Sequence, residues 1–333
     1  MLLLYFLLLH FNNIQLTSQV TYSCDFTVPC GCSASYASVS KIVGGENASE
    51  NTWGWAVSLS IDDSWMCGGS LISSSWILTA AHCVFESQNA EIFVSAASNA
   101  LYGAQQWRYA SSVIVHPQYD ENSLVNDIAL IQVSSPFNMT DPRLSLICLP
   151  VATTSDYPPV GSTVVAIGWG QVSETGPTSN ALQQVSLQRI RYESSSCRPM
   201  INNKTMQICA GVSGGNKDTC YGDSGGPLMF FTESRQWVIV GLTSYGYECA
   251  SRTYAGIYTR MTFYLDWIRS MNVTDAVTAN TITTTVSYNN SILIRTVTMQ
   301  KTNSTNNSLS FYQGAYLLFI AIPILFLSII FEF

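Results

Sequence analysis

The sequence predicts an all-β protein with a sandwich or barrel architecture, and three observations support this. Between residues 42 and about 271, short apolar runs alternate with Gly, Ser, Asn and Pro, which is typical of many short strands joined by turns. Clear examples occupy residues 55–61, 75–78, 128–133 and 237–240. The apolar fraction of 47% is enough to form a sizeable core. A late apolar stretch, 263–268, fits a short closing helix.

Composition and charge exclude several classes of function. The 333 residues include 14 Lys and Arg against 21 Asp and Glu, which gives a formal net charge of −7. A chain with this acidic balance offers no basic face for phosphates, so we expect no nucleic-acid partner. Charged residues make up only 11% of the chain, below the roughly 25% of average soluble domains.

The ten cysteines point to an oxidising compartment. No pair has CxxC spacing and none lies near a His-rich tract, so the sequence predicts disulfides rather than a metal site. The apolar run at residues 1–10 indicates a secretory signal peptide over residues 1–18, with a buried N-terminal helix as the alternative.

The C-terminal part of the chain changes composition. More than half of residues 272–310 are Ser, Thr or Asn, which predicts a stalk rather than a packed core. Glycosylation sequons in the stalk and in the preceding domain begin at Asn272, Asn289, Asn303, Asn306, Asn47, Asn138 and Asn203. Residues 311–333 form an apolar tail without a following Lys or Arg, which favours a GPI-anchor signal. A single-pass membrane helix and a buried segment are the alternatives.

Two motifs carry candidate chemistry. Of the three histidines, His10 falls within the signal, which leaves His82, in Thr-Ala-Ala-His-Cys, and His116, in Val-His-Pro. Ser224 lies within Gly-Asp-Ser-Gly-Gly-Pro, where flanking glycines allow a sharp turn. Such a turn can aim two backbone N–H groups at one developing oxyanion. Taken alone, this pattern also fits an ordinary tight turn.

The order of four motifs along the chain is more specific. Ile-Val-Gly-Gly begins at Ile42, Ala-Ala-His-Cys ends at Cys83, Asp-Ile-Ala-Leu begins at Asp127, and the serine motif follows. From residue 42 to about 271, this arrangement resembles the chymotrypsin-type, trypsin-like serine proteases. The resemblance implies two six-stranded antiparallel β-barrels with a short C-terminal helix and an active site in the cleft between the barrels.

The resemblance also implies residue roles. Ser224 would be the nucleophile, His82 the general base and later the general acid, and Asp127 the carboxylate that orients the imidazole. The amides of Gly222 and Ser224 would form the oxyanion hole. His116 matches a loop position outside this triad, so we expect it at the surface.

Members of this family are made as zymogens. The resemblance implies a propeptide over residues 19–41 and cleavage between Lys41 and Ile42, after which the new α-ammonium inserts beside Asp223. The positive charge compensates a carboxylate that is costly to bury alone. Lys41 implies an activating protease of trypsin-like specificity or another copy of this enzyme.

Specificity follows from the residue six positions before the nucleophile, which is Asp218. By resemblance it lies at the base of the primary pocket, where a carboxylate selects Arg or Lys. Ser244, Gly246 and Gly256 would line the pocket walls. The alternative for Asp218 is a surface acid beside Cys220. Three departures from the common family pattern, Tyr245, Glu248 and Ala255, put the extended subsite preferences in doubt.

By motif position the resemblance also implies a set of disulfides. The implied pairs are Cys67–Cys83, Cys197–Cys209 and Cys220–Cys249, with Cys148 as the propeptide tether. Cys30 and Cys32 are too close to pair comfortably with each other. We favour Cys32–Cys148 and Cys24–Cys30, and either arrangement of the remaining cysteines keeps the propeptide attached. Residues 91–105 carry a single acid, Glu91, so we expect no calcium loop.

Together these observations predict a membrane-anchored or secreted serine endopeptidase that cleaves after Arg or Lys without a cofactor. Its expected partners are protein or peptide substrates, an activating protease and protein protease inhibitors. The alternatives are chymotrypsin-like or elastase-like selectivity, a protease restricted to one target, and a catalytically inactive binding module on the same fold. An inactive module would usually lack a triad member, and all three are present here.

Overall fold

The protein is described by a computed structural model. It describes residues 19–40, 45–62, 65–87, 91–151, 156–212, 214–215, 218–273, 276–279, 281–289 and 292–300. The predicted signal peptide, Lys41, Ile42 and the apolar tail lie outside the described residues.

A closed antiparallel barrel forms the first half of the domain. Its strands follow the spatial order β4-β5-β6-β9-β8-β7. Their bounds are β4 Ala56–Ile61, β5 Trp65–Leu71, β6 Trp76–Thr79, β7 Ile92–Ala96, β8 Gln106–Val115 and β9 Ala129–Val133. The predicted apolar runs at 55–61, 75–78 and 128–133 thus form strands β4, β6 and β9. Buried side chains such as Leu59, Ile77 and Leu130 fill the barrel.

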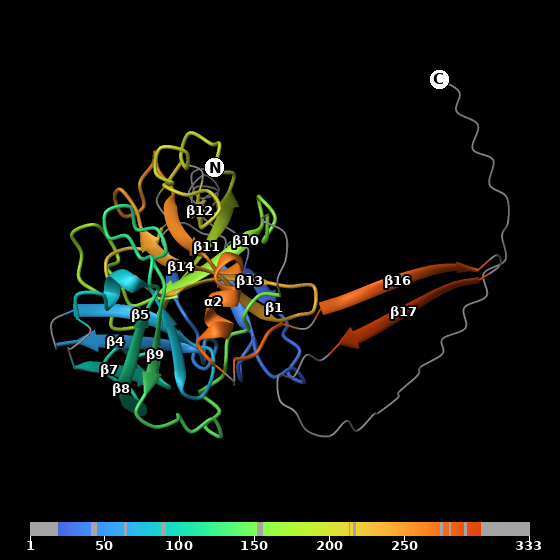
Figure 1. Ribbon diagram of the computed structural model, residues 1–333, viewed down its shortest axis with the longest axis horizontal. Helices are drawn as coiled ribbons and strands as arrows, with labels where there is room; N and C mark the ends of the chain where they lie inside the picture. The colour runs from blue at the N-terminus through green and yellow to red at the C-terminus, as the bar shows by residue number, and fades with distance from the viewer. Residues whose placement is uncertain are drawn as a thin grey trace, which may run out of the picture. The chain divides into compact units, whose positions relative to one another are not determined.

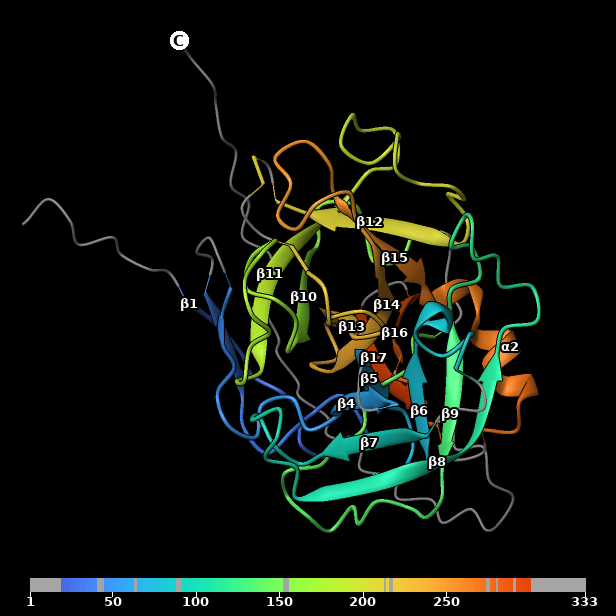
Figure 2. The same cartoon turned by 90° about the vertical axis from the view of Figure 1, so that its left-hand side faces the viewer.

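A second antiparallel barrel follows in sequence. Its sheet has the order β10-β13-β14-β15-β12-β11, and pairing of β10 with β11 closes it. The strands are β10 Thr163–Gly168, β11 Gln183–Ile190, β12 Gln207–Gly211, β13 Pro227–Phe231, β14 Trp237–Tyr245 and β15 Gly256–Arg260. The short strand β3 (Glu46–Asn47) pairs with β11, and the short helix α2 (Leu265–Ser270) follows the last barrel strand. The two-barrel prediction is confirmed, and the barrels lie side by side in both views (Figures 1 and 2).

One apolar core continues between the barrels. Met229 of β13 belongs to the same buried cluster as the side chains of the first barrel, and its sulfur lies 3.1 Å from the indole nitrogen of Trp55. The Gly68 amide of β5 also donates to the carbonyl oxygen of Ser224, at 2.7 Å. This contact joins the serine loop to the first barrel.

The N-terminal segment corrects one predicted disulfide. Strands β1 (Gln19–Tyr22) and β2 (Ala37–Ser40) form a hairpin, and between them Cys24 pairs with Cys32, while Cys30 pairs with Cys148. The prediction of Cys32–Cys148 and Cys24–Cys30 was wrong.

Gly31 supplies the physical reason for the observed pairing. It has a left-handed φ of +74°, and a Cβ there would lie 2.9 Å from Cys148 Sγ and even closer to the Trp237 backbone. Its amide donates to the Leu146 carbonyl and its carbonyl accepts from the Trp237 amide. The turn at Gly31 therefore puts Cys30 against the second barrel and leaves Cys32 for Cys24. The other three predicted pairs, Cys67–Cys83, Cys197–Cys209 and Cys220–Cys249, form as expected.

The segment after α2 is more structured than its composition suggests. The amide of Ala279 donates to the Leu149 carbonyl at 3.0 Å, and Leu149 donates back to Val277 at 2.9 Å. The chain thus pairs with the domain beyond residue 271, where the sequence placed its end. Further on, β16 (Thr281–Asn289) and β17 (Ile292–Gln300) form an antiparallel hairpin within the predicted stalk. Among the described residues, no helix is long and apolar enough to cross a membrane.

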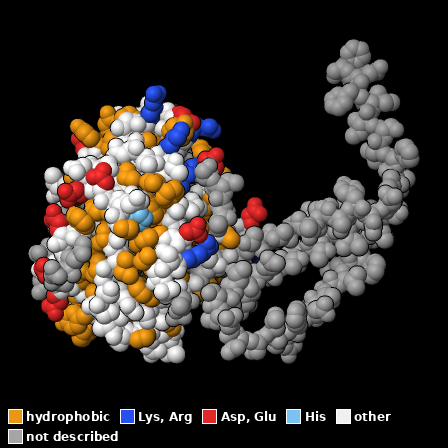
Figure 3. Space-filling view, viewed as in Figure 1, with side chains coloured by type: hydrophobic (Ala, Val, Ile, Leu, Met, Phe, Trp, Pro, Cys, Tyr) orange, Lys and Arg blue, Asp and Glu red, His pale blue; other side chains and the backbone are white. Residues whose placement is uncertain are grey.

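The surface combines apolar patches with sparse charge. On the face shown in Figure 3, hydrophobic side chains form broad patches, while Lys and Arg side chains are few and do not merge into a continuous basic surface. The exposed apolar side chains include Trp107, which is 50% exposed, and Tyr102, which is 89% exposed.

Candidate active site

His82 and Asp127 form a preorganised pair in the first barrel. His82 follows β6 in a short 3₁₀ turn (Ala81–Cys83), and Asp127 precedes β9. The His82 Nδ1 lies 2.8 Å from Asp127 Oδ2, and the His82 backbone amide donates to Oδ1 at 2.9 Å. Because an ionised carboxylate only accepts, Nδ1 carries the proton, and Nε2 is left free to accept one.

The electrostatics of this pair favour a basic imidazole. The Asp127 side chain is fully buried, and that of His82 is 18% exposed. Burial alone lowers the pKa of His82, but the charge of Asp127 and its hydrogen bond outweigh this effect and leave the pKa raised. The arrangement suits a group that takes up a proton during a reaction.

Two residues of the second barrel hold Asp127 in place. The Ser244 hydroxyl of β14 donates to Asp127 Oδ2 at 2.5 Å, and the Thr259 hydroxyl of β15 donates to the Asp127 backbone carbonyl at 2.7 Å. From the sequence, Ser244 is expected only in the pocket wall, and Thr259 has no expected role. Neither contact has a local sequence signal, because both depend on how the barrels pack.

Ser224 and His82 line one cavity of about 270 Å³. Gly222, two residues before the serine, has a left-handed φ of +96°, a conformation that L side chains rarely adopt. Among the described residues, no acceptor is bonded to the Gly222 or Ser224 amide, so both N–H groups remain available to an oxyanion.

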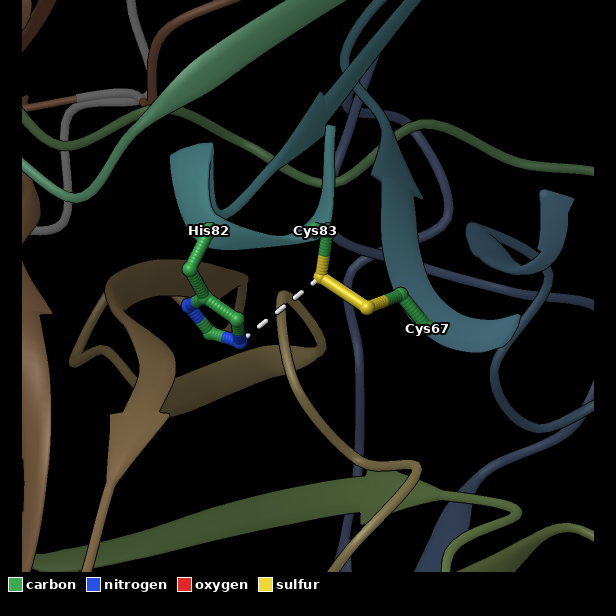
Figure 4. Close-up of side chains that lie close together, drawn as sticks. All are labelled: Cys67, His82 and Cys83. Atoms are coloured by element: carbon green, nitrogen blue, oxygen red, sulfur yellow. Dashed lines mark hydrogen bonds between the residues drawn. A yellow bond between two sulfur atoms is a disulfide. The ribbon is translucent and has the colours of Figure 1, made fainter. Parts of the chain in front are cut away.

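A disulfide lies against the imidazole. Cys83 pairs with Cys67 of β5, and the Cys83 sulfur is 3.9 Å from His82 Nε2 (Figure 4). The three side chains are close enough together to resemble a metal-ligand set. The disulfide removes both thiolates, however, so this group fits a brace for the histidine turn rather than a metal site.

Asp218 is in the wall of the same cavity. It is partly buried, accepts a hydrogen bond from the Thr219 amide at 2.9 Å, and approaches the Tyr258 hydroxyl at 3.5 Å. Burial raises the pKa of Asp218 to about 7, and the nearby charge of Asp223 adds to this effect. A Cβ at Gly256 would lie 2.6 Å from Asp218 Oδ1, so glycine makes room for the carboxylate.

The other predicted pocket residues surround Asp218. Ser244, Gly246 and Gly256 all line the cavity, together with Tyr245 and Glu248. The Tyr245 hydroxyl donates to the Met200 carbonyl at 2.8 Å, so this side chain is fixed to the loop of the Cys197–Cys209 disulfide. Ala255 is buried in a cluster with the Cys197–Cys209 disulfide and does not line the cavity.

Asp223 faces a separate, smaller cavity of about 100 Å³, which Gly45 and Asp218 also line. Its carboxylate accepts hydrogen bonds from the amides of Gly170, at 2.8 Å, and Cys220, at 2.9 Å. Loss of solvent raises the pKa of Asp223 to about 6. No ion pair with Asp223 occurs within the described part of the chain.

Gly168 and Gly170, which belong to none of the four motifs, make room for the Asp223 carboxylate. A Cβ at Gly168 would collide with Asp223 Oδ1, and one at Gly170 would lie 2.6 Å from its carboxyl carbon. The Gly-Trp-Gly sequence at 168–170 was the available signal. His116, expected at the surface, is half-buried: its amide donates to the Ile128 carbonyl, and its ring packs against Tyr264 and Trp267 and does not line the cavity of Ser224. Burial lowers its pKa.

Comparison with known proteins agrees with the geometry. The model of the trypsin family matches residues 42–268. Transmembrane protease serine 11G of Rattus norvegicus is 34% identical over 243 residues, which cover 72% of this chain and 58% of the relative. The protein of that name from Mus musculus is 35% identical with the same coverage. Transmembrane protease serine 11C of Mus musculus is 36% identical over 69% of this chain and 53% of the relative.

The match leaves part of each relative uncovered. This chain spans between about half and three fifths of the length of these three proteins. The two barrels lie within residues 42–268, which the trypsin-family model matches.

Proposed function

The chain belongs to the trypsin family of serine proteases, and from this premise we propose that it hydrolyses peptide bonds after Arg or Lys with His82, Asp127 and Ser224 as its catalytic triad. The observation that carries the proposal is the hydrogen-bonded His82–Asp127 pair in the same cavity as Ser224 and Asp218.

The mechanism follows from the hydrogen bonds at the site. With its Nδ1 proton held by Asp127, His82 accepts the Ser224 hydroxyl proton at Nε2 while Ser224 Oγ attacks the scissile carbonyl. The negative charge of Asp127 stabilises the imidazolium that forms. His82 then protonates the leaving amine, and a water molecule activated in the same way hydrolyses the acyl-enzyme.

The oxyanion is stabilised by the free amides of Gly222 and Ser224. Preorganised donors of this kind contribute roughly 3–4 kcal/mol each to transition-state stabilisation in related chemistry. The glycine at 222 supports this role, since its left-handed φ allows the sharp turn that precedes Ser224.

Asp218 accounts for the proposed preference for basic residues. Its carboxylate is partly buried and the described residues offer it no cation, so a substrate guanidinium or ammonium ion would supply the missing charge. Gly246, whose Cβ would lie 4.0 Å from Asp218 Oδ2, leaves the approach open for a long side chain.

Asp223 supports the proposal of activation by cleavage between Lys41 and Ile42. Gly45 lines the cavity beside Asp223, and it follows Ile42 by only three residues. An extended segment of that length spans roughly 10 Å, so the new α-ammonium of Ile42 is within reach of this carboxylate. An ion pair there would compensate the charge and order the oxyanion loop.

The Cys30–Cys148 disulfide bears on the fate of the propeptide. It joins residues 19–41 to the protease domain, so the propeptide stays attached after activation. Release of this segment from the cleaved protein on a gel only under reducing conditions would support the tether.

We also propose that the protein enters the secretory pathway and acts at the outer cell surface, with the apolar tail as a GPI-anchor signal or a membrane helix.

Paired fluorogenic peptides test the proposed function directly. The full chain, cut at Lys41 with a bead-bound protease that is then removed, is given peptides with Arg or Lys before the scissile bond and peptides with Phe, Leu or Ala there. We expect cleavage of the basic set, and no cleavage by Ser224→Ala.

Other outcomes would point to other functions. Cleavage of the apolar set alone would contradict the role of Asp218. Failure to react with a fluorophosphonate probe, with Ile42 confirmed as N-terminus, would indicate a binding module.

A further inference from the structure

A row of outward-facing side chains crosses the first barrel. On its outer face, Ser58 of β4 pairs with Ser95 of β7, which pairs with Trp107 of β8. In the adjacent row, Ser60 pairs with Phe93, which pairs with Tyr109. Opposite residues on neighbouring strands share a face, so these side chains form one continuous surface.

Both rows begin beside the serine loop. Ser58 pairs with Gly68 on β5, whose amide donates to the Ser224 carbonyl at 2.7 Å. Ser60 pairs with Met66, and the Met66 Cε lies 2.9 Å from where a Cβ on Gly222 would be. Strand pairing therefore connects the predicted oxyanion loop to the aromatic side chains: the first row starts at the buried Ser58, which is 7% exposed, and becomes exposed at Trp107.

The far end of the two rows is a stacked aromatic cluster. The ring centroids of Phe93 and Trp107 are 5.1 Å apart with an interplanar angle of 24°, and Tyr109 packs edge-on against both rings. Trp107 and Tyr109 are nonetheless 50% and 42% exposed. Exposed aromatic rings at a surface hollow are typical of binding sites for apolar groups.

This surface is also hollowed. A groove of about 540 Å³, twice the volume of the cavity at Ser224, is lined by ten residues that include Met66, Ser95, Tyr102 and Trp107. None of the ten is charged. The groove therefore suits an uncharged, apolar partner rather than an acidic or basic one.

The groove extends from the catalytic site on the side where the leaving half of a substrate, the part C-terminal to the scissile bond, is expected. The proposed His82 Nε2 gives its proton to the leaving amine, so that half of the substrate starts at Nε2. This nitrogen contacts the Cys67–Cys83 disulfide, and Met66 directly precedes Cys67. The acyl half, with its side chain beside Asp218, would lie instead against β14 and β15 of the second barrel, whose Ser244 and Gly256 line the Asp218 cavity.

We propose that this groove binds the part of the substrate that lies C-terminal to the scissile bond and selects a bulky apolar or aromatic residue there. Its lining includes Met66, Phe93, Ser95, Tyr102 and Trp107. Three strand spacings separate Gly68 from Trp107, or about 14 Å. An extended peptide covers that distance in about four residues. The selected residue is therefore about the fourth after the scissile bond, and the inference rests on the proposed peptidase function.

The test uses matched quenched peptides on the activated full chain. All carry Arg before the cut and differ only at the fourth residue after it, which is Trp, Ser or Glu. Each rate is divided by that for an Arg-aminocoumarin substrate, which has no leaving peptide. We expect kcat/KM to favour the Trp peptide by about tenfold, in line with the worth of one apolar contact in a pocket.

Three variants sharpen the test. Trp107→Ser should remove the preference for Trp. Ser95→Arg adds a cation to the groove and should shift the preference toward Glu. Tyr192→Ser removes an aromatic residue of similar exposure (40%) outside the groove and should keep the wild-type ratio.

The outcomes separate the two proposals. Failure to hydrolyse Arg-aminocoumarin would overturn the proposed function itself. Hydrolysis of it without a preference at the fourth position, or with a preference unchanged in both groove variants, would overturn this inference alone. A dimer in sedimentation that Trp107→Ser dissociates would also overturn it and assign the face to contacts between copies.

Discussion

The two barrels differ in the partners that they provide for their buried carboxylates. In the first barrel Asp127 is fully buried, yet it accepts hydrogen bonds from the His82 ring, the His82 amide and Ser244. In the second barrel Asp218 and Asp223 have only neutral donors among the described residues, and their pKa values rise to about 7 and about 6. The buried carboxylate of the first barrel is thus already paired with His82, whereas the two of the second barrel have no cationic partner among the described residues.

This difference suggests a division of labour. Acid–base chemistry requires a fixed imidazole, so its partner belongs to the folded domain. Substrate recognition and activation each depend on a cation that binds later. For Asp218 this is a substrate side chain, and for Asp223 it is the new N-terminus. A carboxylate without a counter-charge has the most to gain from such a cation.

The largest expected loss of activity comes from changing the His82–Asp127 pair. Asp127→Asn should lower kcat by about 10⁴-fold, because an amide favours the wrong imidazole tautomer; this is the size of loss known for the equivalent change in this family. Hydrolysis of an Arg-aminocoumarin substrate measures it. Asp120→Asn, an exposed acid in the same segment, is the control. A loss below tenfold would mean that the pair is not part of the machinery.

Asp218 should show the next largest effect. Asp218→Ser should lower kcat/KM for Arg substrates by about 10²- to 10³-fold, since loss of one partner from a desolvated charge pair costs roughly 2–5 kcal/mol. The matched change is Glu248→Gln, an exposed acid that lines the same cavity. Equal losses in the two variants would show that overall negative charge, rather than the position of Asp218, selects basic residues.

Cleavage at Lys41 should stabilise the protein more at pH 7 than at pH 4.5. In the uncut chain the raised pKa of Asp223 lowers the free energy of unfolding. This cost is absent below about pH 4, grows as the pH rises from about 4 to about 6, and is complete above about pH 6. A rise from 3.8 to about 6 corresponds to up to about 3 kcal/mol at neutral pH. Pairing with the α-ammonium of Ile42 would reverse that cost.

Urea unfolding of the Ser224→Ala chain, uncut and cut, measures this difference at the two pH values. Addition of Asp223→Asn should remove the pH-dependent part whatever its own effect on stability. A stabilisation that is the same at both pH values would contradict the proposed ion pair.

The smallest effect concerns the binding of benzamidine, a cation that mimics an Arg side chain. With a pKa of about 7 in the free enzyme, Asp218 is protonated at pH 6 and ionised at pH 8. The dissociation constant should therefore rise about tenfold from pH 8 to pH 6. A variant that combines His82→Ala with Asp223→Asn removes the two nearby groups that also titrate in this range. A flat profile in that variant would show that Asp218 is already charged at pH 6.

Much of this protein follows from local sequence. The short apolar runs predict strands because side-chain alternation and turn residues are local properties, and β4, β6, β9 and β14 form where expected. The motifs around His82, Asp127 and Ser224 identify the family because their order and residue types are specific. The sequence also predicts three disulfides by motif position.

Only the tertiary structure decided how distant residues meet. The left-handed turn at Gly31 assigns Cys30 rather than Cys32 to Cys148, and spacing alone could not distinguish the two. The contact of Ser244 with Asp127 depends on how two barrels pack, and the aromatic rows depend on the register of four strands. Strand register and barrel packing are set by many distant contacts at once, so no short segment of the sequence encodes them.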